Sequence, residues 1–185
     1  MVDNYPKASY YGLRKFWISN ILNWKVTEMN RRIELMKHLE NGRKLIVVDI
    51  ENAVGRGMVD EGSCREVRDR IVREYRPGEG DLTVIGVSHQ DNVFPARSWE
   101  GARIVLKKGH DGADLALESV LSDENVERRF SEVVLVSGDG LFSEQAARLR
   151  SLGVRVTVDV QARRLSRILA FSCSAIRLAP SALAA

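Results

Sequence analysis

From residue 44 onward, short runs rich in β-branched residues alternate with segments that have helical spacing. The runs at 44–49 and 82–87 are apolar nearly throughout, which is typical of strands covered on both faces of a sheet. Strands and helices in alternation connect through right-handed crossovers, which place successive strands parallel to one another. The pattern therefore predicts a three-layer, Rossmann-like α/β fold with a mainly parallel central sheet of about five to six strands.

The individual elements are predicted from apolar runs and from helical periodicity. Strands are expected at residues 44–49, 82–87, 103–106, 133–136 and 154–158, with a weaker one at 175–178. Helices are expected between them at residues 63–75, 114–121, 143–152 and 162–171. Gly153 directly follows the third of these helices and suits its C-terminus.

Residues 1–43 do not follow this alternation. Their apolar positions include Phe16, Trp17 and Trp24, and two helices are predicted, at 10–22 and 26–40. Aromatic side chains close together are costly to leave in water, so we expect this segment to pack on the domain, on a protein partner or in a homodimer. We therefore expect an N-terminal helical extension at 1–43, an α/β domain at 44–179 and a disordered tail at 180–185.

Charge and cysteine content limit the possible partners and compartments. The chain has 28 basic and 25 acidic residues, a net charge of +3, which permits nucleic-acid binding without arguing for it. Cys64 and Cys173 are isolated, which argues against a disulfide framework or a zinc ribbon and favours a reducing compartment. No signal-peptide core and no membrane-length apolar run are present. We expect a cytoplasmic protein with no membrane partner.

Three aspartates follow predicted strands. Asp49 ends the first strand, Asp139 lies in a glycine-flanked turn after the fourth, and Asp114 opens the helix after the third. Each alone fits a helix N-cap. Ligands of open parallel sheets bind beyond the carboxyl ends of the strands, however, so these carboxylates are expected at one rim. Because converging carboxylates repel one another, the sequence predicts a Mg²⁺ or Mn²⁺ site there.

Three motifs around these aspartates resemble the NYN family of PIN-like ribonuclease domains. They are VVDIEN at 47–52, DGADLAL at 111–117 and VSGDGLF at 136–142, and LRSLGVRV at 149–156 is similar to the helix-to-strand passage that follows in that family. The resemblance covers about residues 44–179 and implies a PIN-like fold. It implies a metal-dependent ribonuclease in which Asp49, Asp114 and Asp139 are the catalytic, metal-binding residues, and whose products have 5′-phosphate ends.

Other polar residues are candidates for substrate binding. The resemblance implies that Asn52 positions substrate or metal, and Ser137 lies in the third motif. Lys107 and Lys108 follow the third predicted strand, where they are expected to hold the phosphate backbone of RNA. Arg56, in a glycine-flanked turn, is expected to contact a phosphate.

Further acids and arginines near the rim leave alternatives open. Asp111 is a reserve ligand, Asp159 a peripheral fourth acid, and Glu118 a partial substitute one helical turn after Asp114. Arginines 163, 164 and 167 lie on one predicted helix, an arrangement also typical of a solvated face.

Two departures from the family pattern support an alternative function. Leu141 and Val120 occupy positions where the family often carries acids. A catalytically weak or inactive domain that binds RNA or a protein is therefore the alternative hypothesis. A haloacid-dehalogenase-type phosphatase is a third, since Glu51 follows Asp49 by two residues, but that class needs a second aspartate at this position.

Overall fold

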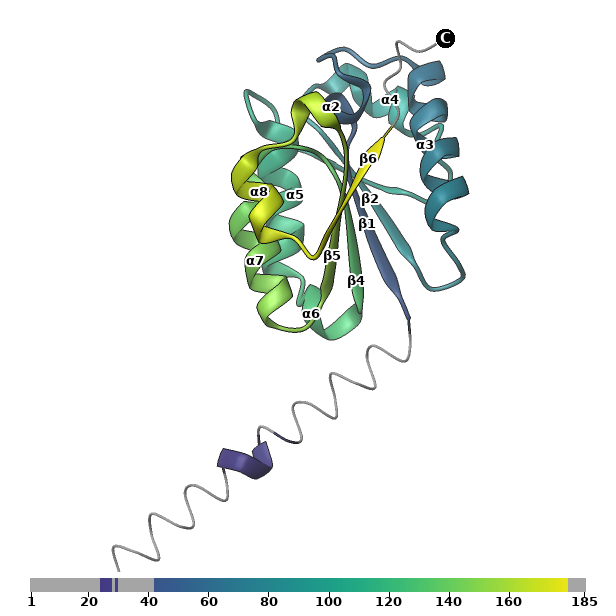
Figure 1. Cartoon of the computed structure of the whole chain (residues 1–185). Helices are drawn as coiled ribbons and strands as arrows, with labels where there is room; N and C mark the ends of the chain where they lie inside the picture. The colour runs from purple at the N-terminus through teal and green to yellow at the C-terminus, as the bar shows by residue number, and fades with distance from the viewer. Residues whose placement is uncertain (1–23, 28, 30–41, 180–185) are drawn as a thin grey trace, which may run out of the picture. The chain divides into compact units, whose positions relative to one another are not determined.

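A six-stranded sheet with every strand parallel forms the centre of the fold. The structure, a computed structural model, describes residues 24–27, 29 and 42–179. The strands lie in the order β3-β2-β1-β4-β5-β6, which is the order of the doubly wound Rossmann sheet. Their bounds are β1 Lys44–Asp49, β2 Leu82–Val87, β3 Arg103–Leu106, β4 Glu132–Val136, β5 Arg155–Gln161 and β6 Ala175–Ala179 (Figure 1).

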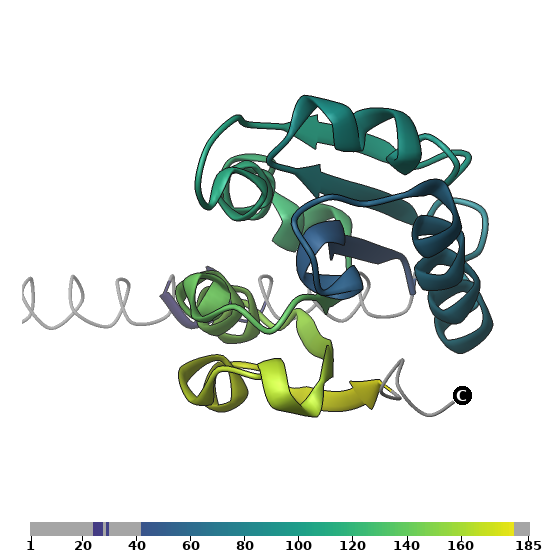
Figure 2. The same cartoon turned by 90° about the horizontal axis from the view of Figure 1, so that it is seen from above.

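Helices cover both faces of this sheet, as the continuous apolar strands require. The α-helices are α2 (Ile50–Val54), α3 (Glu61–Tyr75), α4 (Val93–Ala96), α5 (Gly112–Asp123), α6 (Val126–Arg129), α7 (Ser143–Ser151) and α8 (Arg167–Ser172). Short 3-10 helices are η1 (Gln90–Asn92), η2 (Gly140–Phe142) and η3 (Ala162–Arg164). Helix α3 lies on one face and α5, α7 and α8 on the other (Figures 1 and 2), so the predicted three-layer α/β fold is confirmed.

Residues of the central strand β1 belong alternately to the two hydrophobic cores on either face of the sheet. Leu45 and Val47 are buried in the core under α5, α7 and α8, whereas Ile46 and Val48 are buried in the core under α3. Each fully buried aliphatic side chain of this kind stabilises the fold by about 1.5–3 kcal/mol. The apolar run that identified this strand in the sequence therefore reflects burial on both faces.

The predicted strands agree with the structure, and one predicted helix needs correction. The bounds of β1, β2 and β3 are as predicted, and β5 extends to Gln161. The helix predicted at 162–171 is wrong as a single element, because η3 and α8 are separate. The backbone between them is extended, and there the Ser166 N–H donates a 2.9 Å hydrogen bond to the Gly138 carbonyl. Arginines 163, 164 and 167 therefore do not share one helix.

The chain divides into two units, Met1–Lys37 and His38–Ala185. Within the N-terminal unit, residues 24–27 and 29 are helical. The predicted helix at 10–22, most of the one at 26–40 and the tail at 180–185 lie outside the described residues, so those expectations stay predictions. Across the described part of the chain, no helix is both long and apolar enough to span a membrane.

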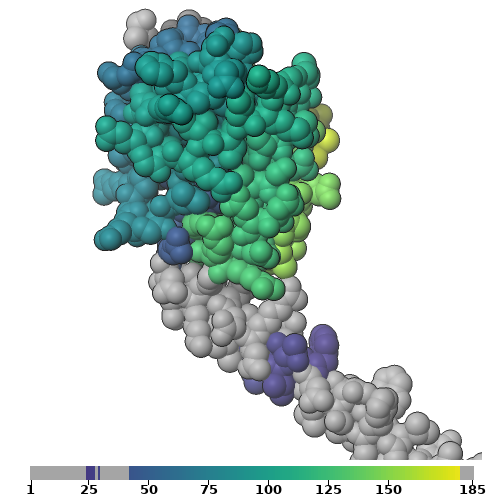
Figure 3. All heavy atoms as spheres, turned by 180° about the vertical axis from the view of Figure 1, so that it is seen from behind, coloured from purple at the N-terminus to yellow at the C-terminus, as the bar shows by residue number. Residues whose placement is uncertain are grey.

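Helix α5 sits unusually close to β2 because of a glycine. A Cβ atom on Gly86 would lie 2.6 Å from Leu117 Cγ and 2.9 Å from the Ala113 carbonyl oxygen. Real Cβ atoms do not approach other heavy atoms so closely, so only glycine lets α5 settle at this height on the sheet. Seen from behind in Figure 3, the teal part of the chain, which includes β2, β3 and the start of α5, covers much of this side of the α/β domain.

We predict that Gly86→Ala lowers the free energy of unfolding by about 1–3 kcal/mol, because the added methyl group overpacks the contact between α5 and β2. Urea denaturation measures this change. The matched control is Gly78→Ala, where a Cβ meets nothing within 4 Å and the change should stay within about 0.5 kcal/mol. Equal stability of the two variants would contradict the close approach of α5.

Candidate functional site

The strand order places a topological switch point between β1 and β4. Strand β1 continues into α2, while β4 leads into η2 and α7 on the other face of the sheet. Chains that leave adjacent strands toward opposite faces open a crevice at the carboxyl ends, where doubly wound sheets bind ligands. Asp49 is the last residue of β1, and Ser137, Gly138 and Asp139 follow β4 directly.

Asp49 is a buried carboxylate held in a fixed orientation. Only 4% of its surface is exposed. Its Oδ1 accepts a 3.1 Å hydrogen bond from the Asn52 N–H, which caps α2, and its Oδ2 accepts a 3.2 Å bond from Ser137 Oγ. Burial raises the pKa of Asp49 above its ordinary value, against the opposing effect of these hydrogen bonds.

Asp114 faces Asp49 from the first turn of α5. The chain enters this helix through Asp111, whose φ is 56°, and through Gly112, where a Cβ would lie 1.8 Å from the Lys107 carbonyl oxygen. Asp114 Oδ1 is buried and has no hydrogen-bond partner in the described part of the chain. Burial, followed by the charges of Asp49 and Asp139, raises the pKa of Asp114 to about 8.

Ser137 and Asn52 connect the turns after β1 and β4. Ser137 Oγ donates to Asp49 and accepts a 3.2 Å bond from the Asp139 N–H. Asn52 Oδ1 accepts a 3.3 Å bond from the Gly138 N–H. Asp139 accepts a 2.8 Å bond from the Leu141 N–H, which caps η2. The two turns are thus held together by side chains that the sequence singled out for substrate binding.

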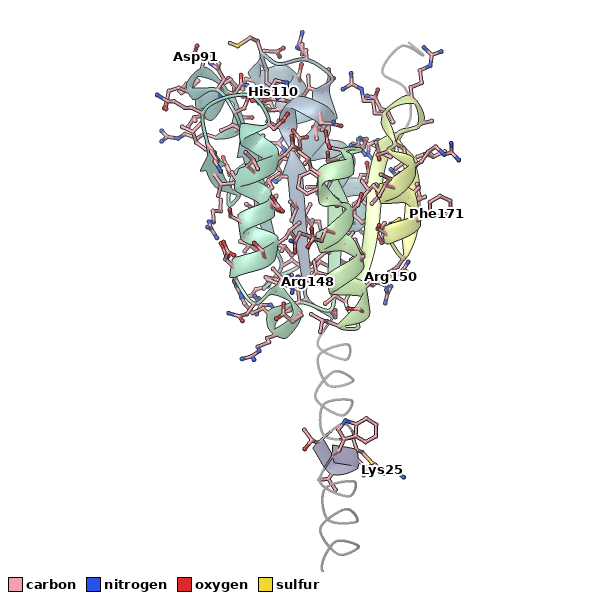
Figure 4. All side chains as sticks on the ribbon, turned by 90° about the vertical axis from the view of Figure 1, so that its left-hand side faces the viewer. Lys25, Asp91, His110, Arg148, Arg150 and Phe171 are labelled. Atoms are coloured by element: carbon pink, nitrogen blue, oxygen red, sulfur yellow. The ribbon has the colours of Figure 1, made fainter. Side chains whose placement is uncertain are left out.

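A pocket of about 270 Å³ opens at this rim. Asp49 and Asp114 both line it, and so do Asn52 and Asp111, whose carboxylate lies 2.8 Å from His110 Nδ1. Asp139 is not among the lining residues, although its charge acts on Asp114. Figure 4 shows His110 at the end of α5 nearest the pocket, opposite to Arg148 and Arg150. The structure therefore brings together two of the three predicted carboxylates and keeps the third nearby.

The described residues contain no group of three or more histidine, cysteine, aspartate or glutamate side chains arranged to hold a metal ion. The three-carboxylate ligand set therefore stays a prediction. What the structure does contain is a pair of carboxyl groups, Asp49 and Asp114, in mutual contact.

The predicted basic residues lie outside this pocket. Lys107 and Lys108 are exposed after β3, and neither side chain forms an ion pair in the described part of the molecule. Arg56 forms an ion pair with Asp60 and donates a 2.5 Å bond to Ser63 Oγ. It faces a second, neighbouring pocket.

Neither Asp159, the alternative peripheral acid, nor Glu118, the alternative partial substitute, lines the acidic pocket. Asp159 lies within β5 rather than after it. Its carboxylate forms ion pairs with Arg70 of α3 and Arg177 of β6, and it accepts a hydrogen bond from the Tyr75 hydroxyl of α3.

One polar network was not found from the sequence. Glu51 also lines the acidic pocket, and its carboxylate accepts hydrogen bonds from the Ser88 N–H at 2.9 Å, Ser88 Oγ at 2.5 Å and Asn92 Nδ2 at 2.7 Å. Asn92 is fully buried and also bonds the Gly57 carbonyl and the Val59 N–H. The network ties α2 to the end of β2. Only the position of Glu51, two residues after Asp49, signalled it in the sequence.

Comparison with known proteins gives a likeness in fold but no family. No family model matches the sequence, and no curated protein matches it. Among solved structures, a protein of unknown function from Vibrio parahaemolyticus is similar, with a TM-score of 0.55 and 19% sequence identity. The match covers 76% of this chain and 94% of that one. At this level of identity the likeness extends to the fold alone.

The raised pKa of Asp114 predicts that stability depends on pH. Folding raises this pKa from an ordinary 3.8 to about 8, so between these values the folded state holds more protons than the unfolded chain. The free energy of unfolding should therefore fall as the pH rises from about 4 to about 8. Asp114→Asn should remove this loss of stability, which amounts to at most about 1.4 kcal/mol per pH unit.

Urea denaturation in EDTA between about pH 5 and about pH 8 measures the difference between wild type and Asp114→Asn. We expect the variant to become progressively more stable than wild type as pH rises. A difference that does not change with pH would show that Asp114 titrates normally.

Proposed function

We propose that this protein is a metal-dependent ribonuclease that hydrolyses RNA phosphodiester bonds at the Asp49–Asp114 pair. The observation that carries the proposal is the placement of these two carboxyl groups, facing each other at the switch point between β1 and β4. Two acids buried side by side destabilise the fold unless a proton or a cation lies between them. Such an unfavourable pair of buried acids is typical of a functional site rather than of residues that stabilise the fold.

The residues fit a hard divalent cation. Asp114 Oδ1 is a buried acceptor without a donor in the described part of the chain, and the carboxyl groups of Asp49 and Asp114 both have raised pKa values. Mg²⁺ commonly binds through one or two carboxylates and completes its shell with water and substrate phosphate. Two direct ligands, Asp49 and Asp114, with the charge of Asp139 nearby, therefore suit Mg²⁺ or Mn²⁺ better than a structural zinc ion, which needs four protein ligands.

The side chains of the site have distinct roles in the proposed reaction. A bound cation would supply Lewis-acid activation of water and of the phosphodiester. Ser137 and the Asn52 backbone hold the Asp49 carboxylate in place, and the Asn52 side chain fixes the turn before Asp139. Asp114 would hold the cation as a carboxylate, and would therefore give up its proton on binding. Lys107 and Lys108, exposed after β3, would contact the phosphate backbone.

RNA is proposed as substrate because the motifs at 47–52, 111–117 and 136–142 resemble those of the NYN family. In the fold these motifs are the β1–α2 junction, the start of α5 and the β4–η2 turn, which meet at the carboxyl edge of the sheet. The proposal thus rests on a resemblance in sequence and on the carboxyl pair in space.

A module that binds RNA without cutting it is the second candidate function. It is favoured by the lack of a three-ligand metal group among the described residues and by exposed Leu141, where the resemblance leads one to expect an acid. Chelation separates the two functions, because a binding module holds RNA equally well in EDTA and never shortens it.

The nuclease is tested with labelled single-stranded RNA, in Mn²⁺ and in EDTA. We expect wild type to cut only with Mn²⁺, and Asp49→Asn to lose cutting by about a hundredfold or more, since it removes a cation ligand. Asparagine also caps helices, so the variant should keep α2 and fold.

The matched control is Asp123→Asn, which changes an exposed acid at the far end of α5 and should cut like wild type. Equal activity of Asp49→Asn and wild type would refute the assignment of the site. Cutting by neither protein, with RNA bound equally in both buffers, would establish the binding module instead.

Cation binding is tested separately by thermal unfolding. At a Mn²⁺ concentration about 100 times its dissociation constant, wild type should gain about 2.7 kcal/mol of stability. Asp49→Asn should lose most of this gain, and Asp123→Asn should keep it. A gain shared equally by all three proteins would place the bound cation elsewhere.

A further inference from the structure

A second pocket, of about 410 Å³, lies beside the acidic one. Asn52 lines both pockets, and Ser137, which bonds Asp49, lines the second. The walls of the second pocket come from α2, α3 and the carboxyl ends of β4, β5 and β6. The two cavities therefore meet across the first turn of α2, at the same edge of the sheet.

The second pocket exists because the core under α3 stops before β5. In the described part of the chain, the strand residues of that core come from β1 to β4 and none from β5 or β6. Where α3 faces these last two strands, polar pairs take over: Arg70 with Asp159, Tyr75 with Asp159, and Arg177 with Glu74. Long charged side chains leave space that aliphatic ones would fill.

Asp159 holds an arginine at the pocket wall. Its side chain is 0% exposed, in the middle of β5, and it forms ion pairs with Arg70 and Arg177. A charge buried in a strand is destabilising unless it is fully paired. Arg70 uses one guanidinium nitrogen for Asp159 and lines the pocket, so its remaining N–H groups can donate to a ligand.

Two polar side chains of the pocket have no partner. Glu66 and Gln161 line it and form no hydrogen bond or ion pair within the described residues. Ala53, Val54 and Val67 supply an apolar wall. The lining thus combines the free carboxylate of exposed Glu66, a free amide and two arginines, Arg56 and Arg70, with an apolar wall, in a volume typical of small-molecule sites.

We propose that this pocket binds one unstacked nucleobase of the RNA, adjacent to the phosphodiester at the acidic pocket, and prefers adenine or cytosine over uracil. This inference rests on the proposed ribonuclease function. A base is favoured over a phosphate because the free Glu66 carboxylate repels anions, whereas the two arginines of the lining, Arg56 and Arg70, are already paired with Asp60 and Asp159. Adenine and cytosine present an exocyclic amino group that donates to a carboxylate, whereas uracil presents a carbonyl oxygen at that position.

The inference extends to the form of the substrate. A base can enter the pocket only when it is released from a duplex, so the site selects single-stranded RNA. Asp159 acts as a positioning residue, because it touches Arg70 rather than the base.

The test measures binding in EDTA, where the proposed nuclease cannot cut. Short labelled oligomers of adenylate, cytidylate and uridylate are titrated against wild type, Glu66→Gln and Asp69→Asn. Wild type should bind the adenylate and cytidylate oligomers about fivefold or more tighter than uridylate, as one added hydrogen bond to a charged group implies. Glu66→Gln should abolish this preference, because its amide can donate to uracil. Asp69→Asn, on the same helix but outside the pocket lining, should keep it.

Each outcome separates the pocket from the nuclease. Equal binding of all three oligomers by wild type, no binding at all, or an unchanged preference in Glu66→Gln would overturn the pocket assignment. If Mn²⁺-dependent cutting persists in that case, the nuclease stands without the pocket. A base preference that Glu66→Gln abolishes, in a protein that never cuts RNA, keeps the pocket and rejects the nuclease.

Discussion

The arrangement of this domain depends on two carboxyl groups kept closer than they would lie in water. Asp49 is fixed by the end of β1 and Asp114 by the first turn of α5, and burial raises the pKa of both. Ser137 and the Asn52 backbone hold the first in place, and the close contact of α5 with Gly86 sets the position of the helix that carries the second. The fold thus keeps two carboxyl groups together although they repel each other, as expected when a bound ligand removes the repulsion.

The fold was accessible from the sequence wherever burial on both faces left an uninterrupted apolar run. Strands β1 and β2 were predicted at their observed bounds for this reason, whereas β3, whose residues are half-buried or exposed, was found from its short apolar run alone. Helices α2, α4 and α6 have only four or five residues, too few to show a helical period, and were not predicted. The helix predicted at 162–171 failed because a tertiary contact, from Ser166 to Gly138, overrides local periodicity.

The candidate site was partly accessible for a related reason. Asp49 and Asp114 follow strands, and parallel topology alone brings such residues to one edge. The network of Glu51, Ser88 and Asn92 joins residues with no common spacing, so only the folded chain reveals it. The second pocket was invisible for the same reason, and Asp159, which the sequence placed at the rim, helps to form its wall instead.

The register between β1 and β4 has a consequence for how the chain acquires its site. Val48 pairs with Val136, so the strand that ends at Asp49 and the strand that precedes Asp139 come from distant parts of the sequence. Closing so long a loop has an entropic cost that local contacts do not offset, and parallel pairings of this kind form slowly. During synthesis, the chain through β3 can form part of a sheet but not the crevice between β1 and β4. The crevice and its carboxyl groups come together only after β4 has emerged from the ribosome and docked beside β1.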